Sequence, residues 1–460
     1  MMNPMQFLLL LLLFGTSRSL VNRQNSTRDQ SFATENITEI RQTAVDSETS
    51  SHVVIGENFE QNQFNQSNAH QLAKRKYERK FESCWNSHDF TIMFHKTACH
   101  DGWMRRLAET AVTQIIDIEH VGLLHSEYRN ENGAIKVVLS DGHKGFFKVC
   151  DAIKGGSTES WKSELLAHAI DRVFAVNRVP ATVPRIIDFK RFGSDAEESK
   201  IATSPELLSR LPAIAEMCQG GHLHFYGSLM GWTQLQVNEK EHYNVEYTNE
   251  NEFDMDHIKQ HNIEFSRLII SLYLNDEPHK FGHNTMTMDT YNGDLFLVSI
   301  DNDRAHWLEH KKDHEHLGHG EQPACNRSPH HSKFTCHHFG QTRAHVKIEM
   351  RHLASYLQSA CIFPRSVASR LKHFAAGVDG SDSKLRPSAA VHSYINMQHD
   401  LAMRSPDAHH FEANTHTDVF TYNRWNDTAL DMRVRFMAKI LKRCIDTYGY
   451  SGVVFGEVED

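Results

Sequence analysis

Residues 275–303, NDEPHKFGHNTMTMDTYNGDLFLVSIDND, contain the clearest structural pattern in the chain. Two partly apolar runs flank Asn292-Gly293, the dipeptide most typical of a two-residue β-hairpin turn. The second run ends at Asp301, followed by two more polar residues. Acidic residues at such a strand end either bind a metal ion or lead the chain out of the core through a polar turn.

The neighbouring segments predict a mixed α+β fold. Residues 261–274 have the apolar content and spacing of a buried helix. A second helix is predicted over 157–174, with Ser157 or Thr158 as its N-cap. Two apolar runs on either side of Ser140-Asp141-Gly142 predict a β-hairpin over 134–151. Residues 178–192 predict a turn and a strand.

The carboxy-terminal part predicts two or three helices after a histidine-rich loop at 306–338. The last helix is predicted within 429–450, with Gly449 as its stop. Thr428 and Asp431 resemble a capping box at its start. Apolar residues at helical spacing form one stripe along it: Leu430, Val434, Met437, Leu441 and Ile445.

Five polar residues then fall at informative places in these elements. Lys148 lies in the second strand of the first hairpin, and Glu164 follows sixteen residues later in a helix. Asn284 comes five residues after His279, in the loop before the second hairpin, and that hairpin ends at Asp301. This order resembles a protein kinase, in which a strand lysine pairs with a helix glutamate and a loop and a hairpin supply metal ligands.

Taken singly, each of these residues has a plain structural interpretation. Lys148 suits the outer face of a strand, and Glu164 suits a helix surface that it shares with His168 and Asp171. The loop residues suit capped turns, and Asp301 suits a polar strand end. The joint order and spacing favour a nucleotide cleft over these separate interpretations.

Several stretches resemble the secretory-pathway kinases related to Golgi casein kinase and to four-jointed. The most specific is ESWKSELLAHAIDRVFAVNRVPATVPR at 159–185, in which a glutamate-bearing helix runs into an Asn-Arg-Val-Pro segment. GFFKVCDA at 145–152, VSIDND at 298–303 and the last helix also resemble segments of that family. The similarity covers roughly residues 130–455, and the loop layout is closer to that of four-jointed.

The resemblance implies a bilobal protein-kinase-like fold, with lobes at 77–230 and 231–460. It implies transfer of the ATP γ-phosphate to Ser or Thr of secreted proteins or extracellular domains, with Mn²⁺ or Mg²⁺ as cofactor. By the same resemblance, Lys148 contacts the phosphates and Glu164 orients Lys148 or assists the metal. Asn284 and Asp301 would bind the metal ion, in line with kinase chemistry.

The sequence departs from that family at the catalytic base. The family's catalytic Asp corresponds to His279, and its Arg corresponds to Lys280. An imidazole titrates near neutral pH and can act as a base. Asp276 or Glu277 could substitute if the loop shifts register. Otherwise the chain would be a pseudokinase that acts as partner or regulator of an active secretory kinase.

The amino terminus predicts entry into the secretory pathway, with the Golgi lumen or the extracellular space as destination. Residues 1–19 predict a signal peptide or a short signal anchor, and 20–76 predict a disordered, glycosylated stalk. The eight cysteines predict disulfides, with Cys325–Cys336 the first expected pair. The predicted glycosylation sites are Asn25, Asn36, Asn65, Asn326 and Asn426.

Composition narrows the possible partners. A net charge of −9 argues against nucleic-acid binding, which needs a basic face, and 40% hydrophobic residues argue against a multi-span membrane protein. His314, His316 and His319 are close enough to share a zinc or copper ion. A solvated insertion is the favoured interpretation of this loop, so a histidine-rich metal-binding glycoprotein is the least favoured class.

Overall fold

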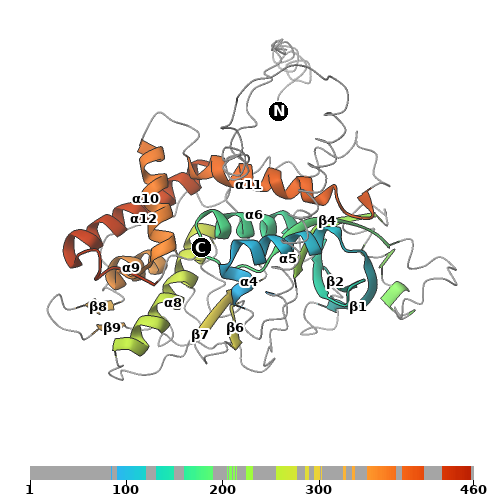
Figure 1. Cartoon of the computed structure of the whole chain (residues 1–460), viewed down its shortest axis with the longest axis horizontal. Coiled ribbons are helices and arrows are strands. Elements are labelled where there is room, and N and C mark those ends of the chain that lie inside the picture. Colours follow the sequence, from blue (N-terminus) through green and yellow to red (C-terminus); the bar gives the residue numbers. More distant parts are fainter. Residues whose placement is uncertain are drawn as a thin grey trace, which may run out of the picture. The chain divides into compact units, whose positions relative to one another are not determined.

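The computed structural model combines helices with a mainly antiparallel set of strands (Figure 1). The chain divides into two units, Met1–His70 and Gln71–Asp460, and every described residue belongs to the second. The structure describes residues 84, 91–120, 131–149, 160–189, 205, 207–209, 211–212, 214, 224–231, 255–276, 285–289, 295–300, 302, 325–327, 334–336, 350–379, 386–408 and 427–456.

A five-stranded antiparallel sheet forms in the first half of this unit, in the order β1-β2-β3-β5-β4. The predicted hairpin is confirmed, because β2 and β3 pair antiparallel on either side of a turn that includes Gly142. Gly142 has a φ of 86°, a conformation that glycine adopts without a steric penalty. The strands are β1 (Val112–His120), β2 (Glu131–Leu139), β3 (Lys144–Lys148), β4 (Thr182–Asp188) and β5 (His224–Gly231).

Helices α5 (Thr97–Glu109) and α6 (Ser160–Val173) both contact β4 and β5, and the short helix α4 (Ile92–His95) leads into α5. The core between them contains large buried side chains, among them Trp103 and Phe147. The predicted helix over 157–174 is therefore present as α6, although it begins at Ser160. Both predicted N-caps lie outside the described residues.

A second, helical core forms around α8 (Met255–Asn275), which extends farther toward the amino terminus than predicted. The hairpin predicted around Asn292-Gly293 is confirmed by the antiparallel pairing of β6 with β7. Strand β7 contacts α8, and its side chains enter both cores: Leu297 the helical one, Phe296 and Val298 the other. These strands are β6 (Thr285–Asp289) and β7 (Leu295–Ser299).

The described residues that follow contain four helices, so the prediction of two or three was too low. They are α9 (Met350–Ala360), α10 (Arg365–Asp379), α11 (Pro387–Ala402) and α12 (Asp427–Tyr448). The apolar stripe of α12 is confirmed, because four of its five residues are buried and Ile445 packs against the same core. The helix ends at Gly449, whose φ is 74° and whose N–H donates to the Ile445 carbonyl.

The predicted capping box at the start of α12 is wrong, because the helix begins at Asp427 and Thr428 lies inside it. Asp431 instead accepts hydrogen bonds from Ser388, at 3.0 Å from its backbone N–H and 3.2 Å from its hydroxyl. Ser388 lies in the first turn of α11, whose backbone N–H groups lack partners within the helix. A carboxylate of α12 therefore caps α11.

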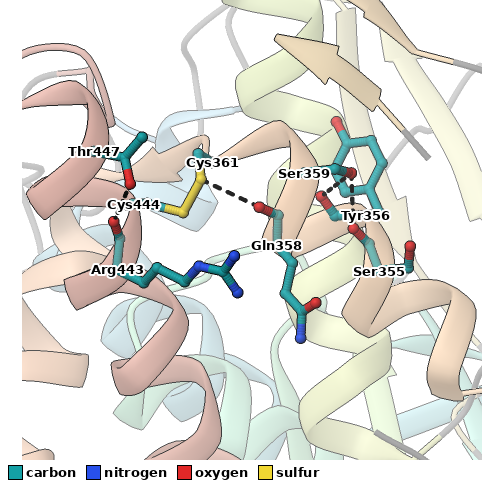
Figure 2. Close-up of a disulfide and its surroundings, with 8 residues drawn as sticks. All are labelled: Ser355, Tyr356, Gln358, Ser359, Cys361, Arg443, Cys444 and Thr447. Carbon is teal, nitrogen blue, oxygen red and sulfur yellow. Dashed lines mark hydrogen bonds between the residues drawn. A yellow bond between two sulfur atoms is a disulfide. The ribbon is translucent and has the colours of Figure 1, made fainter. Parts of the chain in front are cut away.

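Two disulfides confirm the prediction of cross-links. Cys84–Cys99 joins the segment before α4 to α5, and Cys361–Cys444 joins the end of α9 to α12 (Figure 2). In the histidine-rich region the structure adds two short paired strands, β8 (Cys325–Arg327) and β9 (Phe334–Cys336). Their register places Cys325 opposite Cys336, and a bond between them stays a prediction.

Within the described ranges, no helix is long and apolar enough to cross a membrane. Strands β10 (Phe363–Pro364) and β11 (Val454–Phe455) pair in parallel, and Phe363 and Val454 are part of the helical core. The predicted signal sequence, 1–19, and the predicted stalk, 20–76, lie outside the described residues, as do the glycosylation sites other than the backbone of Asn326.

Candidate nucleotide site

The structure brings Lys148 and Glu164 together. Lys148 is the last residue of β3, and Glu164 lies in the second turn of α6. The lysine Nζ is 3.2 Å from the glutamate Oε1, and the two residues are only 5% and 2% exposed. An exposed strand lysine and a surface helix charge were the plain interpretations, and burial excludes both of them for this pair.

The second half of the chain reaches the same carboxylate. The backbone N–H of Asn302 donates to Oε2 of Glu164 at 2.9 Å. The Asn302 side chain is fixed in turn, because the Ser299 hydroxyl donates to its Oδ1 at 2.9 Å. Glu164 thus holds Lys148 with one oxygen and the turn that follows β7 with the other. In the sequence, Asp301 immediately precedes Asn302.

A second carboxylate of α6, that of Asp171, is also buried. Asp171 is 1% exposed and accepts a hydrogen bond from the backbone N–H of Arg178 at 2.9 Å. Burial raises the pKa of Asp171 to about 6, although the N–H groups of Arg178 and Val179 and the guanidinium of Arg172 oppose that shift. Asp171 therefore fixes the turn after α6, which contains the Asn-Arg-Val-Pro segment.

Arg178 joins that turn to the helical core. Its guanidinium donates to both carboxylate oxygens of Glu264 in α8, with Nε 2.8 Å from Oε2. The same guanidinium lies 4.0 Å from the ring centre of Phe296 in β7. The backbone carbonyl of Arg178 accepts a hydrogen bond from the Ser299 N–H at 2.8 Å. Bidentate pairing and ring stacking are geometries that arginine provides and lysine does not. Arg178 thus helps to position β7, the strand that leads to Asp301.

Asp276, one candidate for the base, lies at the end of α8 in an ion pair. Its Oδ2 is 2.5 Å from a terminal nitrogen of Arg433 in α12, and both side chains are almost completely buried. Asp276 has a φ of 60°, an uncommon conformation for a residue other than glycine. A buried carboxylate held in this way has a clear structural role at the junction of α8 and α12.

The structure leaves three predicted site residues undescribed: His279, Asn284 and Asp301 lie outside the described residues. Glu277 and the histidines at 306–338 also lie outside them. Among the residues that are described, no group of three or more His, Cys, Asp or Glu side chains could hold a metal ion. The metal ligands therefore stay predictions from the sequence.

Sequence reasoning missed Asn302, Glu264 and Arg433 as partners of the predicted residues. Asn302 belongs to the polar segment that follows the predicted strand, but nothing nearby in the sequence shows that its backbone N–H would contact Glu164. Glu264 lies 86 positions from its partner Arg178. Arg433 lies 159 positions from Leu274, whose carbonyl it contacts. Only the packing of α8 against its neighbours brings these pairs together.

The Lys148 environment fits a bound nucleotide phosphate. A buried ammonium oriented by a carboxylate is the arrangement by which a protein presents fixed positive charge to phosphate oxygens. Nδ2 of Asn302 is a second group that suits a ligand oxygen, because it is buried and has no hydrogen-bond partner among the residues that the structure describes. A buried donor without a partner is costly, and a ligand oxygen would satisfy it.

Comparison with known proteins gives matches among solved structures. A Golgi casein kinase shares 13% identity over 77% of this chain and 78% of its own, with a TM-score of 0.41. Hydra Fam20 with sugar shares 11% over 76% and 90%, with a TM-score of 0.40. A Golgi casein kinase with Mn/ADP bound shares 14% over 90% and 97%, with a TM-score of 0.42.

No family model matches the chain, and no curated protein matches it. Two of the three structures are of Golgi casein kinase and one is of hydra Fam20. The buried contact between Lys148 and Glu164 is the feature of the described residues that bears most directly on function.

Proposed function

We propose that the chain is a bilobal, four-jointed-like secretory-pathway kinase that uses ATP and a divalent metal ion, Mn²⁺ or Mg²⁺. Its substrates would be Ser or Thr residues of secreted proteins or extracellular domains, in the Golgi lumen or outside the cell. The observation that carries the proposal is the buried contact of Glu164 with both Lys148 and the Asn302 backbone. One carboxylate thereby links the strand lysine to Asn302, which follows the predicted metal ligand Asp301 in the sequence.

In this proposal the residues divide the work of phosphoryl transfer. Lys148 binds phosphate oxygens, and Glu164 keeps its ammonium in place by the 3.2 Å contact. Asn284 and Asp301 bind the metal ion. The bound metal would neutralise charge that develops on the phosphate oxygens. Because the transition state for phosphoryl transfer is loose, positioning and charge neutralisation matter more than a strong base.

The base position is assigned to His279. Asp276 and Glu277 were the alternatives; Glu277 lies outside the described residues, and the buried ion pair of Asp276 with Arg433 gives Asp276 another role. A carboxylate that left this pair would leave the Arg433 charge buried without its partner, which is costly. An imidazole at the base position would act only when it is uncharged, so the rate would fall as acid protonates it.

The second candidate function is a pseudokinase that binds nucleotide and regulates an active secretory kinase. The observation that favours it is the pair His279-Lys280, where the resembling family has Asp-Arg. The described contacts around Lys148 are compatible with both candidates, because nucleotide binding does not need the base. The two differ in turnover.

The test compares phosphate transfer with nucleotide binding in the same samples. The secreted full chain is incubated with labelled ATP and Mn²⁺ and with casein-like and cadherin-type substrates. Asp301→Ala and His279→Ala are assayed beside it. Asp446→Ala is the matched control, because Asp446 is an exposed acid on α12 that pairs with a neighbouring exposed lysine at 2.7 Å.

Transfer that is lost in Asp301→Ala and His279→Ala but kept in Asp446→Ala supports a working kinase. An unchanged rate in Asp301→Ala contradicts that assignment. If the wild-type chain transfers no phosphate but ATP with Mn²⁺ raises its melting temperature, the pseudokinase is supported. If neither transfer nor stabilisation is found, the nucleotide site is wrong.

A further inference from the structure

A chain of buried polar side chains connects the helices around α6. His100 of α5 and His168 of α6 meet through their Nε2 atoms at 2.8 Å, with their rings nearly parallel at 18°. Nδ1 of His168 is 2.8 Å from Nε2 of Gln398 in α11. The chain ends on two carbonyl oxygens, of Met93 at 3.1 Å from His100 Nδ1 and of Thr182 at 3.1 Å from Gln398 Nε2.

The carbonyl ends determine where each proton lies. A carbonyl oxygen only accepts, so Nδ1 of His100 donates to Met93 and Nε2 of a neutral His100 must accept. Nε2 of His168 therefore donates, and Nδ1 of His168 accepts from the Gln398 amide. That amide has a second N–H, which donates to Thr182. Each hydrogen bond of this network then has one donor and one acceptor, which is possible only when both imidazoles are uncharged.

A positive charge on either ring would break this order. Protonated His100 would direct a second N–H at the N–H of His168, and protonated His168 would direct one at the Gln398 amide. Both rings are completely buried. Burial and the guanidinium of Arg172 lower the pKa of His100 and of His168 well below the ordinary value, and His168 further lowers that of His100.

The surrounding groups come from each packed element. Helix α6 contributes Arg172 and Asp171, α5 contributes Asp101, and α11 contributes Tyr394, whose ring centre is 5.7 Å from that of His168. Arg172 donates to the Phe94 carbonyl at 2.8 Å and to Asn177 Oδ1 at 2.7 Å. The groups that α4 and β4 contribute are the carbonyl oxygens of Met93 and Thr182, at the two ends of the hydrogen-bond network.

The position of His168 connects this chain to the nucleotide site. His168 follows Glu164 by four residues in α6, which is one helical turn. The partners of His168 are His100 of α5 and Gln398 of α11, which in turn contact α4 and β4. These hydrogen bonds therefore attach α6 from several sides. A shift of α6 would move the Glu164 carboxylate relative to Lys148, whose position is set by the pairing of β3 in the sheet.

We propose that His100, His168 and Gln398 act as positioning residues that lock α6 in place for Glu164, and that the lock requires both imidazoles to be neutral. The consequence for Glu164 rests on the proposed nucleotide site, whereas the lock itself does not. Acidification would open the lock, because the imidazoles can take up protons only when α6 separates from its partners.

Hydrogen–deuterium exchange of the full chain tests the lock without nucleotide. Protection of α6 backbone amides, 160–173, is measured between about pH 7.5 and about pH 5 and corrected for the intrinsic exchange rate. Below the ordinary histidine pKa, each histidine should lower protection by up to about tenfold per pH unit. His168→Gln removes one titrating group, so the slope of log protection against pH should fall by the contribution of one histidine, up to about tenfold per pH unit. His373→Gln, at an exposed histidine of α10, should keep the wild-type slope.

His168→Phe removes both hydrogen bonds, and should lower α6 protection by roughly tenfold or more even at neutral pH, because His100 and Gln398 lose their partner. If that variant does not fold, the slope in His168→Gln decides. A slope that is the same in wild type and His168→Gln overturns the lock.

Thermal stabilisation by ATP with Mn²⁺ separates this inference from the proposed function. If α6 protection depends on pH but ATP with Mn²⁺ does not raise the melting temperature, the lock is supported and the nucleotide site is wrong. If ATP with Mn²⁺ raises the melting temperature but α6 protection does not depend on pH, the nucleotide site is supported and the lock is wrong. If both hold, His168→Phe should also weaken the apparent ATP affinity, and an unchanged affinity would overturn the link between His168 and Glu164.

Discussion

The backbone N–H of Asn302 donates to the Glu164 carboxylate across 138 positions of sequence. Because the other oxygen of this carboxylate faces Lys148, one buried acid contacts the sheet strand β3 and the turn after β7. The contact makes the geometry of the candidate site depend on both halves of the described chain.

The first prediction concerns the Lys148–Glu164 pair. Lys148→Met or Glu164→Gln should each lower the free energy of unfolding by about 3–5 kcal/mol, because either change leaves a buried group without its partner. The double variant should lose clearly less than the sum, since neither remaining group is charged. Denaturant unfolding of all four proteins measures this coupling. Additive losses would show that the two charges do not interact.

The second prediction concerns Arg178 and Glu264. Arg178→Lys should destabilise the protein by about 2–4 kcal/mol, because lysine cannot make the two-pronged contact or stack on Phe296. Glu264→Gln should have a comparable effect. Thermal and denaturant unfolding measure it, with Lys442→Ala as control.

Lys442 forms an exposed pair with Asp446, for which about 0–1 kcal/mol is expected. A loss for Arg178→Lys no larger than that of Lys442→Ala would contradict a structural role for the buried pair.

The third prediction is a pH dependence that comes from Asp171. Its pKa is about 6 in the folded protein and near the ordinary 3.8 when unfolded, so the folded state binds the proton more tightly. Below the unfolded pKa both states are protonated. As pH rises from about 4 to about 6, the unfolded state ionises first and stability falls.

Asp171→Asn removes this ionisation while keeping an oxygen that can accept from the Arg178 N–H. The unfolding free energy of the variant minus that of the wild type should therefore increase between about pH 4 and about pH 6 and then level off. Urea unfolding across this range measures the difference. A difference that stays flat across the window would contradict the raised pKa.

The fourth prediction compares the two disulfides. Cys361–Cys444 links residues 83 positions apart, and Cys84–Cys99 links residues 15 apart. In the chain-entropy account, removing the longer link costs about 4–5 kcal/mol and removing the shorter about 3 kcal/mol. Alanine replacement of both cysteines in each pair, followed by denaturant unfolding without reductant, tests this order.

Figure 2 shows that the longer link joins the end of α9 to α12, with Cys361 Sγ 3.3 Å from the Gln358 carbonyl oxygen. Its loss should therefore loosen the helical core first, which proteolysis of α12 would detect. Equal stability of the two alanine variants would show that loop length does not determine the effect.

Local pattern predicted several elements well. The turn at Gly142, the pairing of β6 with β7 and the apolar stripe of α12 all follow from short-range spacing, because a hairpin turn or a helix face depends on residues that are close in sequence. Helix starts were less predictable. The capping box at Thr428 failed because Asp431 found a partner in α11, and nothing near Asp431 in the sequence shows that contact.

The sequence by itself determined the order of the elements and the residue types at the candidate site, since both are written locally in the chain. Only the tertiary structure decided which polar groups are buried together: Lys148 with Glu164 and Asn302, Arg178 with Glu264, and His100 with His168 and Gln398. The physical reason is that a buried polar group needs a partner, and that partner is provided by whichever distant segment packs beside it.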